Sequence, residues 1–522
     1  MLCESLPPPR PRGRVNIVSP GYFGWPITTS LSHFAPAIET GLAEVRRKYP
    51  HLNWTSEFLL SESFTDCFTL RDNIQYELAK WYYTKPYGDD VLTVIITPGC
   101  FESRYLSELA GPWDLLLITS VDYTERMRYR QEYPSYVTTS PLTPVNGVIY
   151  CALFATMQWT KLYLLHDTSG APYYTFQASV LPLSIPANCK VQLTRQQFAS
   201  NYPNVSQQLQ PILRDFNSKS RVLLYFGNAT GLRILLIEAE KLNMTSGEHL
   251  FVAVTPLDYT AYGNFTWQNM DNDDETVRRA YRAVLLIRLV DITAYSTPPI
   301  RRLVQEWRAL ALNRYNNTEL RHNLILPAMM AAYTAVELLA EAIQSASPGG
   351  WTKTPPSGKF LADQLLNHTF NLQVGSVRML GQGQLSHRHL ATCFDFQTGC
   401  FRTCLISRNT PVTEHLIWER VQDGRWFDGD SFPPNEPVCG FDGHRNSNEC
   451  TRQSAIWNQW SFGVGLTLLG LVSVSLLGAF LIRRHLREFP SWELNHYFLD
   501  FQSSWLISYT THSVGSDSFD LT

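Results

Sequence analysis

The sequence predicts an α/β protein with two lobes, in which mainly parallel sheets are flanked by helices, followed by one transmembrane helix. Short apolar runs alternate with amphipathic stretches of helical length, which indicates βαβ units and parallel sheets. The region before the membrane span has roughly 460 residues, more than one hydrophobic core usually supports, so we expect two lobes. An uncharged stretch of 21 apolar and small residues, Phe462–Ile482, is long enough to cross a bilayer as a helix.

The expected strands are short apolar runs. Runs such as V-L-T-V-I-I are apolar on both faces, which is typical of parallel strands covered by helices on each side. We expect strands at Arg14–Ser19, Val91–Thr97, Asp114–Thr119, Lys161–His166, Val222–Phe226 and Leu250–Val254. We expect helices between them at Ala35–Lys48, Arg71–Tyr83, Gly147–Gln158, Val205–Phe216 and Gly231–Leu242.

A second long apolar segment, Leu324–Ser345, is predicted to be a core helix and not a second membrane span. Glu337 and Glu341 interrupt its apolar surface, and no basic residues follow it directly. A membrane-spanning helix with two carboxylates and no basic flank would be unusual.

The flanks of Phe462–Ile482 predict its orientation. Trp457 and Trp460 precede the span, where indole rings favour the membrane interface. Three arginines follow it, at positions 483, 484 and 487, so the positive-inside rule places the C-terminus in the cytosol. These flanks disfavour the alternative of a buried core helix.

The composition of the region before the span is typical of an extracellular protein. All ten cysteines precede the span, as expected in an oxidising compartment. All seven N-x-[ST] glycosylation acceptors also precede it: Asn53, Asn204, Asn228, Asn243, Asn264, Asn316 and Asn367. The net charge of −3 argues against a nucleic-acid partner. Residues 1–14 contain no apolar run and show no signal peptide, so we expect an incomplete N-terminus or a mispredicted first exon.

Several motifs resemble the ligand-binding region of natriuretic-peptide-type receptors. The chain carries S-P-G-Y-F-G-W after the first expected strand, then P-A-I-E-T-G-L, S-F-T-D-C and T-P-G-C in that order. Tyr333–Ser345 resembles the family's returning helix, and Pro437–Cys450 resembles its juxtamembrane cysteine box. The resemblance covers about residues 13–485. It implies a type I periplasmic-binding-protein fold and kinship with membrane guanylate cyclases.

The resemblance also implies how the chain is divided. Residues 1–12 are expected to form a disordered leader, and residues 13–436 a bilobal ligand-binding region. Lobe 1 should comprise about residues 13–135 and 325–372, and lobe 2 about residues 136–324 and 373–436. Residues 437–461 should form the cysteine box, 462–482 the transmembrane helix and 483–522 the cytosolic tail.

The tail departs from the membrane guanylate cyclases, which continue with kinase-like and cyclase domains. Its 40 residues are too few for a catalytic fold and hold no glycine-rich phosphate loop. As written, this chain is therefore not expected to make cyclic GMP. A receptor of the clearance or decoy type and a truncated version of a full receptor cyclase both stay open.

The cysteines divide into predicted pairs and open cases. Cys67 and Cys100 follow neighbouring strands of a βαβ unit, where they lie close enough to bridge, and the family pairs the matching positions. The resemblance implies a Cys439–Cys450 pair as well. Cys393 and Cys404 flank a candidate hairpin turn at Gln397–Gly399, which favours a bridge across two strands. The pairing of Cys151, Cys189 and Cys400 stays open, and Cys3 lies in the leader.

Motifs for enzymatic chemistry or metal binding are not recognisable. The sequence has no G-x-S-x-G, no H-E-x-x-H and no C-x-x-C pair. His387 and His389 alternate, but two histidines fall short of a zinc site, and we expect a solvated edge there. The acidic run Asp271–Glu275 is expected to be a solvated loop leading into a helix at Thr276–Ala283.

The resemblance implies further site residues in lobe 1. The family binds chloride there, and Gly99 and Cys100 match its ligands, with Ser61 as the nearest serine; the alternative is a helix N-terminus that binds water. Trp81 matches a tryptophan of the family's dimer interface, although it could equally be a core residue. Thr69 and Glu102 stand where the natriuretic receptors place an acidic residue and a tyrosine, with Phe101 beside Glu102. These mismatches make a natriuretic peptide an unexpected ligand.

Two functions from different classes are compatible with these observations. The first is a single-pass type I receptor at the cell membrane, a homodimer that binds an extracellular peptide or small molecule and passes a rotation through the cysteine box. The second is a tethered clearance or scavenging protein without catalytic output. No cofactor is expected beyond a structural chloride. A glutamate-type receptor is disfavoured, because neither several membrane spans nor a cysteine-rich domain is present.

Overall fold

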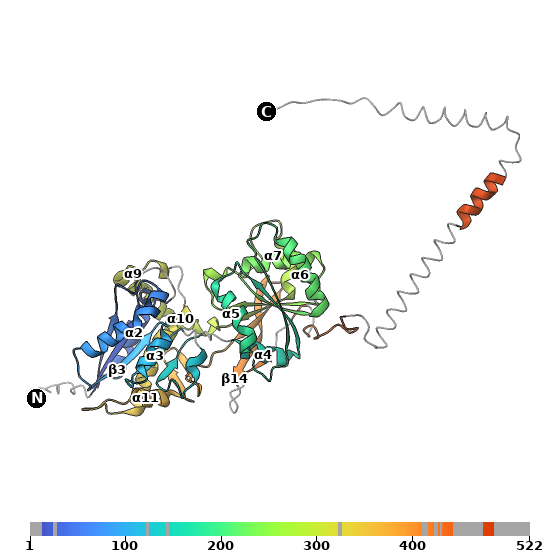
Figure 1. Ribbon diagram of the computed structural model, residues 1–522. Coiled ribbons are helices and arrows are strands. Elements are labelled where there is room, and N and C mark those ends of the chain that lie inside the picture. The colour runs from blue at the N-terminus through green and yellow to red at the C-terminus, as the bar shows by residue number, and fades with distance from the viewer. Residues whose placement is uncertain are drawn as a thin grey trace, which may run out of the picture. The chain divides into compact units, whose positions relative to one another are not determined.

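The computed structural model describes residues 13–23, 29–121, 125–141, 146–321, 326–409, 416–421, 426–427, 431–441 and 473–484. The chain forms two compact units, residues 1–437 and 438–522. Among its described residues, the first unit contains two large sheets, each covered by helices on both faces, and one two-stranded sheet (Figure 1). The predicted fold class, parallel sheets flanked by helices in two lobes, is confirmed.

Lobe 1 is built on a five-stranded parallel sheet. Its strands are β1 (Gly13–Pro20), β2 (Leu52–Leu59), β3 (Val91–Thr97), β4 (Leu116–Thr119) and β5 (Tyr136–Thr138), in the order β2-β1-β3-β4-β5. One face packs against α1 (Leu31–Lys48), α9 (Pro298–Tyr315), α10 (Leu326–Ala346) and α11 (Gly358–Leu365). The other packs against α2 (Cys67–Thr84) and α3 (Ser103–Ala110). Val94 and Ile96 enter the first core and Ile95 the second, because successive side chains of a strand point to opposite faces.

Lobe 2 is built on an eight-stranded mixed sheet. Its strands are β6 (Lys161–Asp167), β7 (Gln192–Phe198), β8 (Val222–Phe226), β9 (Leu250–Thr255), β10 (Val284–Arg288), β13 (Leu390–Asp395), β14 (Cys400–Asn409) and β15 (Leu416–Arg420), in the order β15-β14-β13-β10-β9-β8-β6-β7. Strands β6 to β10 are parallel, and β13, β14 and β15 add to β10 in antiparallel fashion. Helices α4 (Gly147–Met157) and α5 (Pro172–Ser184) cover one face, and α6 (Val205–Lys219), α7 (Ala229–Lys241) and α8 (Asp274–Ala280) the other.

Smaller elements complete the first unit. Strands β11 (Thr369–Leu372) and β12 (Gly375–Arg378) form an antiparallel pair. Short 3₁₀ helices occur at Glu125–Arg128, Thr260–Tyr262, Tyr281–Ala283, Ile292–Tyr295 and Glu319–Arg321.

The chain passes between the lobes three times, through what we call the crossing segments. They run from β5 to α4, from β10 to α9, and from β12 to β13. The predicted lobe boundaries placed β5, α9 and residues 373–385 in lobe 2, whereas the structure packs these segments in lobe 1. Trp307 of α9 explains the correction: it is fully buried in the core of lobe 1, and its indole N–H donates to the hydroxyl of Thr40 at 2.7 Å.

The two apolar segments differ in burial. Helix α10 is long and apolar enough to cross a membrane, but 89% of its most apolar window is buried in the protein, as predicted for a core helix. Residues 473–484 are helical and expose large apolar side chains: Val474, Leu476, Leu477, Phe480, Leu481 and Ile482. The rest of the predicted span, residues 462–472, lies outside the described residues.

All six predicted strands and all helices predicted before the membrane span are found, with ends that differ by a few residues. The prediction did not include β2, β5, β7, β10, β11, β12, β15, α3, α5, α9 and α11. Strand β7, Q-L-T-R-Q-Q-F, is largely polar because it is the edge strand of the lobe 2 sheet and is half-exposed. Its hydrophobic periodicity is therefore weak.

Candidate ligand-binding surface beside the Cys67–Cys100 disulfide

Cys67 and Cys100 form a disulfide in lobe 1, with their Cα atoms 5.8 Å apart. Cys67 is the first residue of α2, and Cys100 lies in the loop that follows β3. The side chain of Asp66 caps α2, since it accepts hydrogen bonds from the N–H groups of Phe68 and Thr69. These bonds, the one from Thr69 above all, lower the pKa of Asp66. The predicted bridge thus ties a capped helix to the end of a buried strand.

A pair of exposed aromatic residues flanks this disulfide. Phe68 follows Cys67 and Phe101 follows Cys100, and their rings stack with centroids 5.4 Å apart. Their exposed fractions are 58% and 42%, so both rings present apolar surface to solvent. The guanidinium of Arg71 lies 5.6 Å from the ring centroid of Phe68. Exposed aromatic rings beside an arginine are common anchors at binding surfaces.

Glu102, one residue further along, is buried and points away from this surface. Its exposed fraction is 1%, and its carboxylate accepts hydrogen bonds from the hydroxyl of Thr97 at 2.9 Å and the N–H of Cys100 at 2.8 Å. Burial raises the pKa of Glu102, and the hydrogen bonds from the loop oppose that shift. Glu102 is therefore unavailable to a ligand, whereas Phe101 is exposed.

The residues that the resemblance implies for chloride are engaged within the chain. Cys100 donates its N–H to Glu102, and the N–H of Gly99 lies 3.3 Å from the Thr97 hydroxyl. Gly99 has a φ of +81°, and a Cβ there would lie 1.9 Å from the carbonyl oxygen of Val121, so this position requires glycine. The hydroxyl of Ser61 bonds to Ser63 and to Glu77 of α2.

Trp81 lies near the end of α2 and is half-buried. It packs against the core between α2, α3 and the sheet, and its ring lies 6.4 Å from that of Tyr87. The same helix exposes Phe68, Tyr76 and Tyr83, whose exposed fractions are 58%, 70% and 76%. The outer side of α2 thus carries more exposed aromatic surface than Trp81 alone provides.

The other cysteines give two further disulfides among the described residues. Cys393 bonds to Cys404 as predicted; Cys404 falls where the register between β13 and β14 shifts, so the bridge closes over a β-bulge. Cys151 bonds to Cys189, a pairing that the sequence left open. Cys400 has an exposed free thiol. Cys439 is disulfide-bonded, but Cys450 and Cys3 lie outside the described residues, so the Cys439–Cys450 pair stays a prediction.

The expectation of a solvated edge at His387 and His389 is wrong. His389 is 7% exposed, and its Nδ1 lies 2.7 Å from the carbonyl oxygen of Leu289. Burial lowers the pKa of both rings to about 4. The reason is that the third crossing segment passes between the lobes just before β13. No group of three or more potential metal-ligating side chains occurs in the described part of the chain.

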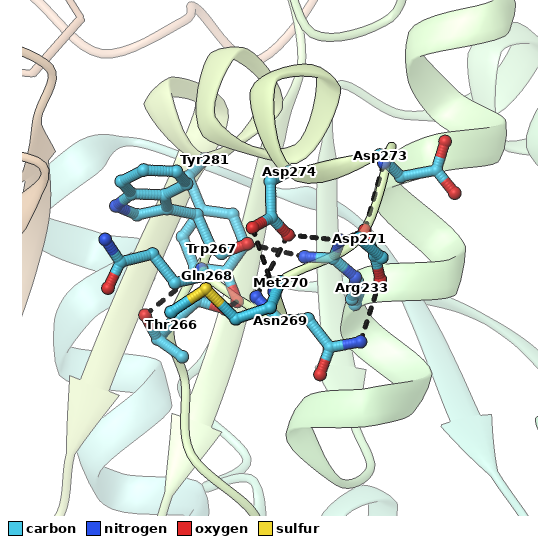
Figure 2. A network of polar contacts seen from close by, with 10 residues as sticks. All are labelled: Arg233, Thr266, Trp267, Gln268, Asn269, Met270, Asp271, Asp273, Asp274 and Tyr281. Carbon is cyan, nitrogen blue, oxygen red and sulfur yellow. Dashed lines mark hydrogen bonds and ion pairs between the residues drawn. The ribbon is translucent and has the colours of Figure 1, made fainter.

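The acidic run leads into α8, with Asp274 and Glu275 in its first turn. Figure 2 shows why it needs no cation: Arg233 of α7 forms ion pairs with Asp271 and, at 2.8 Å, with Asp274. Asp274 also accepts the N–H groups of Asn269 and Met270. Arg233 is 9% exposed and ties the loop to α7, while Asp271, Asn272, Asp273 and Glu275 are exposed, as expected for a solvated loop.

Six of the seven glycosylation acceptors have exposed side chains: Asn53, Asn204, Asn243, Asn264, Asn316 and Asn367. Asn228 is half-buried, and its Oδ1 accepts the N–H of Ala171 at 2.9 Å. No acceptor lies between residues 54 and 203, which include α2 and α3. The outer side of α2 therefore carries no glycosylation acceptor.

Sequence reasoning missed the Phe68–Phe101 pair as a unit and the burial of Glu102. The signal for the pair was present, because an aromatic residue directly follows each cysteine of a predicted bridge. No sequence pattern predicts the burial of Glu102, because it is the turn after β3 that directs its side chain inward.

The two-lobed α/β fold, with an exposed aromatic surface beside a disulfide, is consistent with a ligand-binding domain. The family described as "Receptor family ligand binding region" matches residues 64–390, more than half of the chain. The chain belongs to this family.

Within the family, the chain is similar to natriuretic peptide receptors. It is 22% identical over 377 residues to human atrial natriuretic peptide receptor 3, a match that covers 68% of this chain and 63% of the relative. The bovine form of the same receptor is also 22% identical, over 378 residues. Rat atrial natriuretic peptide receptor 2 is 22% identical over 367 residues, covering 67% of this chain and 33% of the relative. The chain thus spans less than two thirds of the relatives it matches.

Proposed function

We propose that this protein is a single-pass type I receptor of the cell membrane whose bilobal extracellular domain binds a peptide. The main support for this proposal is the exposed Phe68–Phe101 pair beside the disulfide of a receptor ligand-binding domain. The ligand would bury these two rings, which sit on rigid elements because a disulfide and a helix cap hold their backbones. The names of the similar receptors, which refer to a peptide, favour a peptide over a small molecule.

We also propose that the receptor is a homodimer through the outer side of α2. Phe68, Tyr76 and Tyr83 expose aromatic surface along this helix, Trp81 lies at its end, and glycosylation acceptors are absent there. Several exposed aromatic side chains along one helix are a feature of many interaction sites. A ligand at Phe68 and Phe101 would then lie near the dimer contact and could change the relative position of the protomers.

We also propose that chloride binds at Gly99 and Cys100, provided that it displaces the carboxylate of Glu102. The N–H of Cys100 is donated to Glu102, so a chloride ion would compete with that carboxylate. No catalytic role is proposed for the region before the span.

The experiment uses the full chain expressed on cells behind an added signal peptide. Secreted peptides fractionated from tissue extract are captured on these cells and identified by mass spectrometry. Capture should fall at least about tenfold when Phe68 and Phe101 are both replaced by serine, because two buried aromatic anchors are lost. The matched control is Phe360→Ser, which removes an exposed phenylalanine from α11.

Equal capture by the double variant and the wild type would disprove the site, and no specific capture at all would disprove the peptide receptor. Atrial natriuretic peptide serves as a separate probe, and we expect it not to bind because Thr69 and the buried Glu102 replace the family's contact residues.

The clearance-type alternative differs in the fate of the bound ligand. A scavenging receptor would internalise its ligand without raising cyclic GMP in membranes supplied with manganese and GTP. Sequencing the messenger past the codon for Arg487 distinguishes this alternative from a full receptor cyclase.

A further inference from the structure

Helix α9 carries three exposed arginines on its outer side, Arg301, Arg302 and Arg308. The opposite side of the helix is buried in the core of lobe 1 through Ile300, Leu303, Trp307 and Ala311. Because of the helical repeat, Arg301 and Arg308 lie on one side of α9, about 10 Å apart along its axis. Arg302 lies beside Arg301 in the sequence. We call these three residues the arginine strip.

In the part of the chain that the structure describes, the arginine strip forms no ion pair. Glu306 is the one acidic residue of α9, and it does not pair with Arg302 one turn before it. The acidic residues of α1 and α10 outside the core have other partners: Glu39 pairs with Arg314, Glu44 with Arg47 and Glu341 with Lys48. The positive charges of the strip are therefore available to an external anion.

Two of these arginines stand where they do not help the helix. Arg301 and Arg302 are the fourth and fifth residues of α9, close to the positive end of the helix dipole. The first turn has no acidic residue to offset them. Positive charge at this end is unfavourable for helix stability, whereas a bound anion would remove the repulsion.

The surroundings of the strip fit a linear polyanion. None of the three arginines lines the cavities at the start of α10 and at the end of α4, so a small molecule has no enclosed site there. A protein partner usually requires apolar anchors, and Leu312 is the one large apolar side chain that α9 exposes. Guanidinium groups pair well with oxyanions, and clustered basic residues are typical of polyanion binding.

The glycosylation acceptor nearest in sequence leaves this surface open. Asn316 follows the last residue of α9, about 20 Å along the helix axis from Arg302. A glycan at Asn316 would thus start well away from the first two arginines of the strip.

We propose that α9 binds a sulfated polysaccharide of the cell surface or extracellular matrix through Arg301, Arg302 and Arg308. Sulfate and carboxylate groups recur along such a chain, so separate groups can meet arginines that lie about 10 Å apart. The proposal rests on the proposed extracellular location, but it shares no residue with the surface at Phe68 and Phe101. A membrane is the less suitable polyanion, because anionic phospholipids are concentrated in the cytoplasmic leaflet.

The test uses the full chain, made in cells that glycosylate it and held in nanodiscs of uncharged lipid. Binding to immobilised heparin at about 0.15 M salt is compared with binding to fully desulfated heparin, to polyglutamate and to phosphatidylserine vesicles. We expect heparin to bind about tenfold more tightly than each of the other probes, because sulfate groups supply most of its charge.

The triple variant Arg301→Gln, Arg302→Gln, Arg308→Gln should bind heparin about tenfold more weakly, since three charge-assisted contacts are lost. The slope of log K against log salt should fall by about 2, because fewer counterions are released on binding. The variant should keep at least the wild-type melting temperature, because it breaks no ion pair with a described residue.

The matched control changes Lys190, Arg214 and Lys353 to glutamine. These residues are also exposed and have no ion pair within the described ranges, so the control removes the same net charge from scattered positions. It should bind heparin as the wild type does.

A second readout locates the contact. Modification of arginines by phenylglyoxal, followed by mass spectrometry, should slow at the arginine strip when heparin is bound and should be unchanged at Arg214. Equal heparin binding by the strip variant and the wild type, or equal weakening in both triple variants, would overturn the proposal. Equally tight binding of desulfated heparin, polyglutamate or the vesicles would overturn the choice of a sulfated polysaccharide. Peptide capture on cells is measured separately, so failure here is distinguishable from failure of the peptide site.

Discussion

The carboxylate of Glu102 accepts a hydrogen bond from the backbone N–H of Cys100 at 2.8 Å, within a loop that a disulfide fixes to α2. The chain thereby supplies its own negative group to a donor that would otherwise suit a bound anion. A carboxylate held by a short turn has a high effective concentration, so an external anion competes poorly with it.

Glu102→Ala should therefore make the protein respond to chloride. We expect replacement of gluconate by chloride at constant ionic strength to stabilise this variant by about 1 kcal/mol, and the wild type by less. The melting temperature of the full chain in each salt measures this. Glu62→Ala, an exposed carboxylate in the same lobe, is the control. Identical responses of Glu102→Ala and the wild type would mean that the loop holds no competing anion.

Glu337 of α10 should make stability depend on pH. It is 7% exposed, its Oε2 has no hydrogen-bond partner, and burial raises its pKa to about 7. Since ionisation is harder in the folded state than in the unfolded chain, the stabilisation by the protonated form is lost as pH rises through about 7. Glu337→Gln should thus match the wild type near pH 4.5 and be more stable at pH 8, by up to about 3 kcal/mol.

Thermal unfolding of the wild type and Glu337→Gln between pH 4.5 and pH 8 measures this difference. Glu341→Gln removes a carboxylate from the same helix that pairs with Lys48 at 2.6 Å, and serves as the control. A gap between Glu337→Gln and the wild type that stays constant across the range would contradict the prediction.

Glycosylation should test both topology and the environment of Asn228. When the chain is expressed in cells behind an added signal peptide, removal of N-glycans should shift its electrophoretic mobility. No shift would overturn the proposed extracellular location.

Glycopeptide mass spectrometry should find Asn204 modified and Asn228 unmodified, because the side chain of Asn228 is half-buried and bonded to the N–H of Ala171. Both residues stand at the N-cap position of a helix, which makes Asn204 a matched comparison. Full occupancy at Asn228 would show that this bond does not persist during folding.

Serine in place of Cys439 or Cys450 should produce covalent dimers. Each single variant leaves one cysteine without its expected partner, close to the membrane. In the proposed dimer, the same unpaired cysteine of the second protomer lies nearby, so the two can form an intermolecular disulfide. Non-reducing electrophoresis of membranes from expressing cells measures the dimers, and the double variant is the control that should stay monomeric. Monomeric single variants, together with two free thiols in the wild type, would show that the two cysteines do not pair.

The buried elements were predictable because their own residues identify them. The run Val91–Thr97 is apolar on both faces, as β3 requires between two helix layers, and α10 is apolar enough to need a buried position. The Cys393–Cys404 bridge was predictable from the hairpin turn between them, although the β-bulge at Cys404 was not. Sequence periodicity reports the environment of one segment and says little about which sheet that segment joins.

The sequence by itself determined the α/β class and the parallel strands of both lobes, because these depend on local patterns, and it placed Cys67 and Cys100 after consecutive strands of one βαβ unit, where the family resemblance also pairs them. Tertiary structure decided that α9 returns to lobe 1, that Glu102 turns inward while Phe101 faces solvent, and that His389 is buried. It also left Arg301, Arg302 and Arg308 exposed on α9 without an ion pair to a described residue. These outcomes depend on which distant segments pack together, and the free energy of such packing is a property of the whole core that no single segment carries.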